Sequence, residues 1–88
     1  MIKDVAQINN VKKLRIIEVG EGEPFFTTYF YTAEGKKFLY SVDEIKFKDI
    51  NTIVWDAGDE IMFGKTASCK IQENVEENFR TVTCSGMD

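Results

Sequence analysis

The sequence has no histidine and only two cysteines, so it lacks the residues that most often carry catalysis and metal binding. Histidine is the most frequent general base and metal ligand in proteins. Two cysteines are too few for a disulfide scaffold, and without histidine they do not complete a structural zinc site. We therefore expect a protein that is not an enzyme and that holds no metal and no cofactor. Cys69 and Cys84 are expected to be reduced, partly buried small residues.

Long apolar runs are also missing. No stretch approaches the roughly 20 apolar residues of a membrane-spanning helix. The segment MIKDVAQINN has no apolar core of the secretory type, and no Asn-x-Ser/Thr acceptor occurs. At 43% hydrophobic and 30% charged residues, the composition is typical of a folded soluble chain. We expect one domain over residues 1–88, in the cytoplasm and without membrane contact.

The formal net charge is −4, from 11 basic and 15 acidic residues. Domains that coat nucleic acid by bulk electrostatics are usually basic. The net charge therefore argues mildly against nucleic-acid binding, and the local distribution of charge is the more informative property.

Hydrophobic and polar residues alternate with a period of two through most of the chain, which predicts a mainly β protein. The turns between strands are rich in glycine and acidic residues and are expected at 20–24, 33–35 and 56–59. The strand candidates are residues 12–19, 25–32, 36–41, 52–55, 60–64, 66–74 and 79–85.

Two segments are candidates for short helical turns. One is residues 4–9. The other begins at the capping-box pattern Ser41-x-x-Glu44, although Ile45 to Lys48 also alternate as a strand would. Both alternatives, helix and strand, remain open for residues 42–50.

The stretch EPFFTTYFYTAEGKKFLYS holds seven aromatic rings in nineteen positions. TAEGK fits a hairpin loop in which Gly35 takes a left-handed conformation. This loop pairs Phe30 with Phe38 and Tyr29 with Leu39. Side chains two apart share a face, so the expected core face carries Phe26, Phe30, Phe38 and Tyr40.

The opposite face is predicted to gather cations around the remaining rings. If GEGEP closes the preceding hairpin with Val19 opposite Phe25, Arg15 lies beside Tyr29 and Lys13 beside Tyr31. The candidate binding face is thus Lys13, Arg15, Tyr29, Tyr31 and Lys37. A turn near Glu76 similarly pairs the last two strand candidates, with Cys69 opposite Cys84.

This order of strands resembles the oligonucleotide-binding (OB) barrel: three meandering strands, a connection at 41–50, a turn at Gly58-Asp59 and the final strand NFRTVTCSG. The tail from residue 58 is similar to the closing hairpin of OB-like modules in bacteriophage replication proteins. The resemblance implies a small antiparallel barrel of five to six strands, whose strands 2 and 3 bind the ligand. The acidic Glu73, Glu76 and Glu77 depart from that pattern and speak against nucleic-acid contact by this hairpin.

Three uses of the candidate face are consistent with its residues. Single-stranded nucleic acid stacks its bases on aromatic rings while nearby cations neutralise its phosphates. Alternatively, the lysine and arginine stems cover the tyrosines as part of an ordinary sheet surface. The third use is protein binding, since tyrosine and arginine are enriched at interfaces.

The sequence thus favours single-stranded nucleic-acid binding, with an acidic protein-binding module, such as a phage-type inhibitor of a larger host or defence complex, as the alternative.

Three other features are weaker candidates for a functional site. Gly64-Lys65-Thr66 resembles the end of a phosphate-binding loop but lacks its first glycine. The acids of EVGEGE and DAGDE have no EF-hand spacing and are expected to be solvated turns. Trp55 is expected at the edge of the core.

Overall fold

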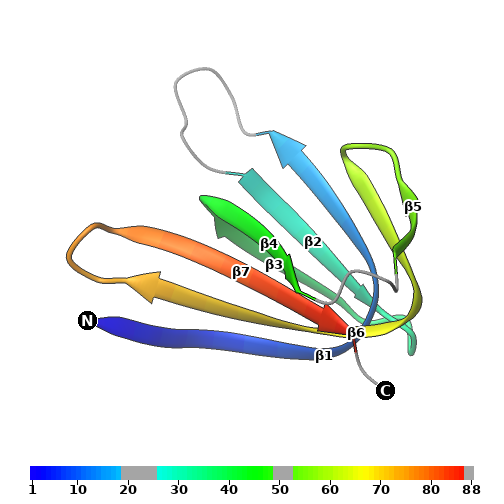
Figure 1. Cartoon of the computed structure of the whole chain (residues 1–88), viewed down its shortest axis with the longest axis horizontal. Coiled ribbons are helices and arrows are strands. Elements are labelled where there is room, and N and C mark those ends of the chain that lie inside the picture. The colour runs from blue at the N-terminus through cyan, green and yellow to red at the C-terminus, as the bar shows by residue number, and fades with distance from the viewer. Residues whose placement is uncertain (19–25, 49–52, 87–88) are drawn as a thin grey trace.

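The computed structural model describes residues 1–18, 26–48 and 53–86 as an all-β protein with no helix in those ranges (Figure 1). The strands are β1 (Ile2–Glu18), β2 (Phe26–Thr32), β3 (Lys37–Val42), β4 (Glu44–Lys48), β5 (Ile53–Asp56), β6 (Glu60–Asn74) and β7 (Phe79–Gly86). Their order in the sheet is β3-β2-β1-β6-β7-β4, and β5 pairs with β6 beside this path. The predicted β class is confirmed.

The expected closed antiparallel barrel differs from the sheet of the structure in two ways. The sheet is mixed, because β4 runs parallel to β7. Its described hydrogen-bonded path ends at β3 and β4, so it is not closed into a barrel. Residues 44–48 form a strand, which resolves the open alternative: Ile45 and Phe47 pack against the core while Lys46 and Lys48 are exposed.

The predicted helical turn at 4–9 is wrong, since these residues are the first half of β1. This half pairs with β6, from Ile2 opposite Asn74 to Ile8 opposite Cys69. A single helical turn fixes several residues for few hydrogen bonds, whereas a long neighbouring strand offers a complete ladder. Likewise, the candidates 60–64 and 66–74 are one strand, β6, which bulges around Gly64.

A bend at Asn10 allows β1 to pair with both β6 and β2. Asn10 has φ 63° and lies where the β1–β6 register shifts, between Ile8 and Val11. Asparagine tolerates this left-handed conformation better than most residues. The Asn10 carbonyl accepts a hydrogen bond from the amide of Ala33 (3.0 Å), which ties the bend to the β2–β3 turn. In Figure 1, β1 runs along the lower edge of the molecule and then turns upward beside β2.

The hairpin registers predicted from the turns are confirmed. Phe30 lies opposite Phe38 and Tyr29 opposite Leu39, while the second hairpin places Ile71 opposite Val82. Gly35, at φ 87°, donates its amide to the Thr32 carbonyl as the loop requires. The proposed contact between Val19 and Phe25 falls outside the described residues.

The core is formed by the side chains that these registers direct inward. Its buried members are Ile8, Val11, Leu14, Phe30, Val42, Ile61, Phe63, Ala67, Cys69, Ile71, Val82 and Cys84. Phe38, expected among them, is 38% exposed because β3 is an edge strand with no described neighbour on its other side. The Tyr40 ring is half-buried and meets Phe30 edge to face at 6.2 Å.

Cys69 and Cys84 form a disulfide bond in this core, which corrects the expectation of reduced thiols. The register places the two residues directly opposite each other, with their Cα atoms 4.0 Å apart. Both side chains are almost completely buried. Disulfides are commoner in oxidising compartments than in the cytosol, so the bond weighs against the expected cytoplasmic residence.

Because of the disulfide, we expect the unfolding free energy to fall when a reductant is added. A bond closing a loop of about 15 residues stabilises by about 3 kcal/mol, because it restricts the unfolded chain. We expect dithiothreitol to lower the unfolding free energy of the wild type by roughly this amount in urea titrations. The double variant Cys69→Ala/Cys84→Ala should not respond to the reductant. A wild-type midpoint that is the same with and without reductant would contradict the bond.

The ion pair between Glu73 and Arg80 is expected to contribute to the unfolding free energy at neutral pH and to lose this contribution in acid. Arg80 Nε donates a hydrogen bond to Glu73 Oε1 (2.8 Å), which lowers the pKa of Glu73 below its ordinary 4.5. Because the pKa of Glu73 is lower in the folded protein than in the unfolded chain, the ionised carboxylate stabilises the fold at pH values above 4.5. This stabilisation is lost as the pH falls from 4.5 through the pKa of the folded protein. Urea titrations at neutral pH and at about pH 3 should therefore show a smaller acid-induced loss for Glu73→Gln than for the wild type. Glu77→Gln, in the turn of the same hairpin, is the control. If acid lowers the unfolding free energy of all three proteins equally, the ion pair does not contribute to stability.

Candidate functional site: an aromatic face across five strands

The five candidate residues share the exposed face of the sheet, as the predicted register requires. Lys13 lies opposite Tyr31, and Arg15 lies opposite Tyr29. Tyr31 in turn lies opposite Lys37 on β3. Because directly opposed side chains project from the same face of a sheet, strands β1, β2 and β3 bring all five together.

The same face continues beyond β1 onto β6 and β5. On β6, Met62 lies opposite Lys13 and Glu60 lies opposite Arg15. Trp55 of β5 lies opposite Met62. One row of side chains therefore crosses five neighbouring strands, and a shorter row runs beside it. We call this surface the aromatic face and define it by its two rows: Lys37, Tyr31, Lys13, Met62 and Trp55, and Leu39, Tyr29, Arg15 and Glu60.

The lysines of the aromatic face lie over its tyrosine rings. The centroids of Tyr29 and Tyr31 are 6.3 Å apart, with their planes inclined by 30°. Lys13 Nζ lies 4.9 Å from the centroid of Tyr31, and Lys37 Nζ lies 5.1 Å from that of Tyr29. These are cation–π contacts at a partly solvated surface, a geometry worth about 0.5–1 kcal/mol each. The tyrosines are thus half-buried beneath charged side chains.

Charge on the aromatic face has the opposite sign to that of the whole chain. The face has three cations and one carboxylate, whereas the protein carries a net charge of −4. The carboxylate of Glu60 lies 3.8 Å from Lys13 Nζ, and both side chains are about one-third exposed. Arg15 and Lys37 form no ion pair with the side chains that the structure describes, in residues 1–17, 27–48 and 53–86. With respect to these side chains, two of the three cations are not neutralised.

Four residues of the aromatic face were not among the predicted site residues: Trp55, Met62, Leu39 and Glu60. Trp55 is 56% exposed, so its expected place at the core edge is wrong. The cause is a register shift between Ile53 and Trp55: Ile53 packs against the core while the tryptophan is turned outward. Counting back from the turn at Gly58, as was done for the other hairpins, would have placed Trp55 opposite Met62.

The other candidate chemistries find no support in the described residues. Gly64-Lys65-Thr66 lies within β6, with no helix following it, so the phosphate-loop geometry is absent there. No group of three or more acidic or cysteine side chains in the described ranges is arranged to hold a metal ion. Cys84 is bonded to Cys69 and has no free thiol. No described helix is long and apolar enough to cross a membrane.

The exposure of Trp55 is directly measurable, since it is the chain's only tryptophan. We expect acrylamide to quench the folded protein nearly as efficiently as the urea-unfolded chain, because Trp55 is already 56% exposed. Removing the disulfide under native conditions should leave this quenching unchanged. A blue-shifted emission with weak quenching would place Trp55 in the core and remove it from the aromatic face.

Comparison with known proteins gives no relative: no family model, no curated protein and no solved structure matches this chain.

Proposed function

We propose that this chain is a small, non-enzymatic binding protein that holds single-stranded nucleic acid on its aromatic face. The observation that supports this most is the row from Lys37 through Tyr31, Lys13 and Met62 to Trp55. Neighbouring strands lie about 4.8 Å apart, so this row extends over roughly 19 Å. That length accommodates several nucleotides of an extended strand, with a stacking ring near each end of the row.

The lysines over the tyrosines are compatible with base stacking on energetic grounds. Each exposed cation–π contact contributes about 0.5–1 kcal/mol, whereas base stacking on an aromatic ring contributes about 1–3 kcal/mol. A base can therefore displace the ammonium group from the ring of Tyr31 or Tyr29. The displaced Lys13 or Lys37 then lies next to the phosphate of the same nucleotide, where its charge is useful to the complex.

We also propose that the fold is a variant of the OB barrel, which is itself partly open. In this proposal β3 and β4 are two halves of one strand, interrupted at Asp43. The first half pairs with β2 and the second with β7, and Asp43 is held to Arg80 by two hydrogen bonds. The aromatic face then includes the surface of strands 2 and 3 that OB proteins use for ligands.

Protein binding remains a second candidate, and the exposed apolar residues favour it. Leu39 is 53% exposed and Val54, next to Trp55, is 65% exposed. Tyrosine, tryptophan and arginine are the residues most enriched at interface hot spots, and the aromatic face has all three. An acidic inhibitor that docks on a larger complex would use the same surface, without the salt dependence that phosphates impose.

Alanine variants of the stacking rings test nucleic-acid binding. We expect Tyr31→Ala and Trp55→Ala each to weaken binding of an oligothymidine of about ten nucleotides by roughly 5- to 150-fold, the loss of one stacked base. Phe79→Ala is the matched control, because Phe79 is an exposed ring on β7, outside the aromatic face. Fluorescence anisotropy of a labelled oligonucleotide gives the affinities, and circular dichroism confirms that each variant is folded.

Salt dependence tests the cations in the same assay. Three phosphate contacts, by Lys13, Arg15 and Lys37, predict a slope of about −2 for the logarithm of the binding constant against the logarithm of salt concentration. Replacing one of the three with alanine should reduce the slope to about −1.4. Folded protein that binds no oligonucleotide at low salt would exclude the proposal and favour the protein-binding alternative.

A further inference from the structure

The edge strand β3 has one side of its backbone unpaired in the described part of the chain. Its neighbour is β2, and the sheet path ends with it. The hairpin bond from the Thr32 amide to the Lys36 carbonyl (2.9 Å) sets which residues face β2, because bonded pairs alternate along an antiparallel ladder. Phe38 and Tyr40 therefore direct their peptide groups towards β2, and Lys37, Leu39 and Ser41 direct theirs outward.

This edge lacks the features that usually prevent strand pairing. Natural edge strands are protected by proline, by bulges or by charged side chains, especially lysine. β3 has no proline, and its register with β2 runs without a shift from Tyr31–Lys37 to Phe26–Val42. Its lysine, Lys37, extends over the ring of Tyr29 on the aromatic face rather than along the edge. In the part of the chain that the structure describes, the outward peptide groups thus have no strand partner.

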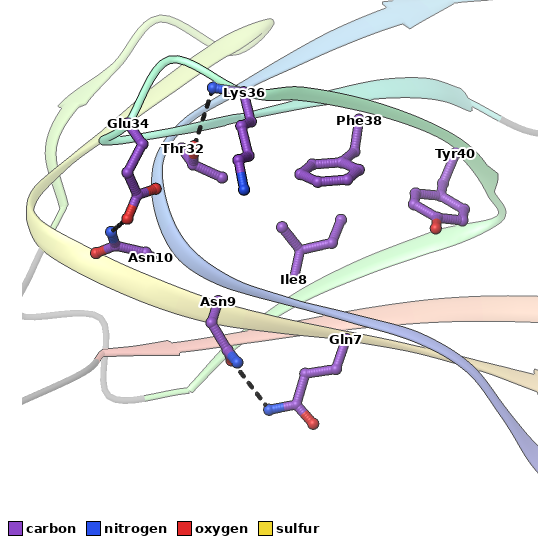
Figure 2. A pocket seen from close by; sticks show the side chains of 9 residues that line it. All are labelled: Gln7, Ile8, Asn9, Asn10, Thr32, Glu34, Lys36, Phe38 and Tyr40. Carbon is purple, nitrogen blue, oxygen red and sulfur yellow. Dashed lines mark hydrogen bonds between the residues drawn. The ribbon is translucent and has the colours of Figure 1, made fainter.

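A concave site lies beside the edge, on the side of β3 opposite to the aromatic face. It has a volume of about 370 Å³. Phe38 and Tyr40 point into it from β3 and Ile8 faces them from β1 (Figure 2). Phe38 is 38% exposed although its ring is directed to the inner side of the sheet. These three side chains form an apolar slot large enough for one bulky side chain.

The polar rim of the slot carries one cation, Lys36, and one carboxylate, Glu34. Lys36 extends from the β2–β3 turn towards the slot (Figure 2). It forms no ion pair with any residue in the described ranges. The nearby carboxylate of Glu34 accepts a hydrogen bond from the Asn10 side-chain amide, and this bond, with a smaller effect from the charge of Lys36, lowers the pKa of Glu34. Glu34 is thus hydrogen-bonded to Asn10, and Lys36 is the cation at the rim that an acidic side chain would approach.

We propose that β3 accepts an extended peptide from a partner protein as an added antiparallel strand. Strand addition uses backbone hydrogen bonds for affinity and pockets for alternate side chains for specificity. The peptide bonds to the outward groups of Lys37 and Leu39. On its inner side it places a bulky apolar residue opposite Phe38, in the slot, and an acidic residue opposite Lys36. Because the strands are antiparallel, the acidic residue follows the apolar one by two positions.

The test uses the acetylated, amidated pentapeptide Thr-Phe-Thr-Glu-Thr as probe and backbone amide chemical shifts as readout. We expect the amides of Lys37 and Leu39 to shift on titration, and those of Phe38 and Tyr40, which face β2, to shift less. The same peptide with its alternate backbone nitrogens methylated should not bind. Equal binding of the methylated peptide, or shifts confined to the aromatic face, would overturn strand addition.

A charge exchange tests the specificity. Lys36→Glu should weaken binding of the pentapeptide by about tenfold or more, since a charged hydrogen bond is lost. The variant should in turn prefer the peptide in which lysine replaces glutamate. Lys48→Glu, an exposed lysine on β4, is the control for the change in net charge. Equal affinities of the wild type and Lys36→Glu for both peptides would refute the role of Lys36.

The remaining candidate for this edge is a second copy of the chain. Sedimentation equilibrium over a range of concentrations distinguishes it from a partner peptide. A monomer that binds the pentapeptide supports the proposal. A dimer in which the pentapeptide fails to shift the Lys37 and Leu39 amides would show that self-pairing occupies the edge, and would overturn it.

Discussion

The pairing of one long strand, β1, with two neighbours is the interaction on which the other features depend. β1 contacts β6 over most of its length and β2 over its second half. The bend at Asn10 makes this double pairing possible by turning the second half of the strand away from the first. As a result, the two hairpins of the chain become parts of one curved sheet. The core fills the inner side of that curve, and the aromatic face occupies its outer side.

A chain of 88 residues without a described helix has little with which to cover that outer side. Sheet faces in larger proteins are commonly packed under helices or a second sheet. Among the described side chains, Lys13 lies over Tyr31 and Lys37 over Tyr29, while Trp55 and Leu39 are more than half exposed. Large exposed apolar side chains that lie together on one surface are typical of binding sites.

Local patterns predicted the hairpins well, since Gly35 and the turn near Glu76 fix their registers within a few residues. They also placed Cys69 opposite Cys84. The disulfide was nonetheless missed, because the number of cysteines and the expected compartment were given more weight than the register. The features that depend on distant segments were not predictable: β6 as partner for residues 2–8, the parallel pairing of β4 with β7, and the exposure of Phe38. Of the aromatic face, sequence periodicity predicted the tyrosines and cations on β1 to β3, but not Leu39 on β3 or the residues on β5 and β6.

The small strand β5 has a thermodynamic consequence for any ligand of the aromatic face. Ile53–Asp56 pairs with β6 alone, at the margin of the described sheet, and it holds Trp55. A ligand that contacts both Tyr31 and Trp55 would bridge β2 and β5, which are far apart in the sequence. Since such a ligand binds the folded chain and not the unfolded one, it raises the unfolding free energy by about 2.7 kcal/mol at one hundred times its dissociation constant. Binding of such a ligand would therefore also stabilise the pairing of β5 with β6.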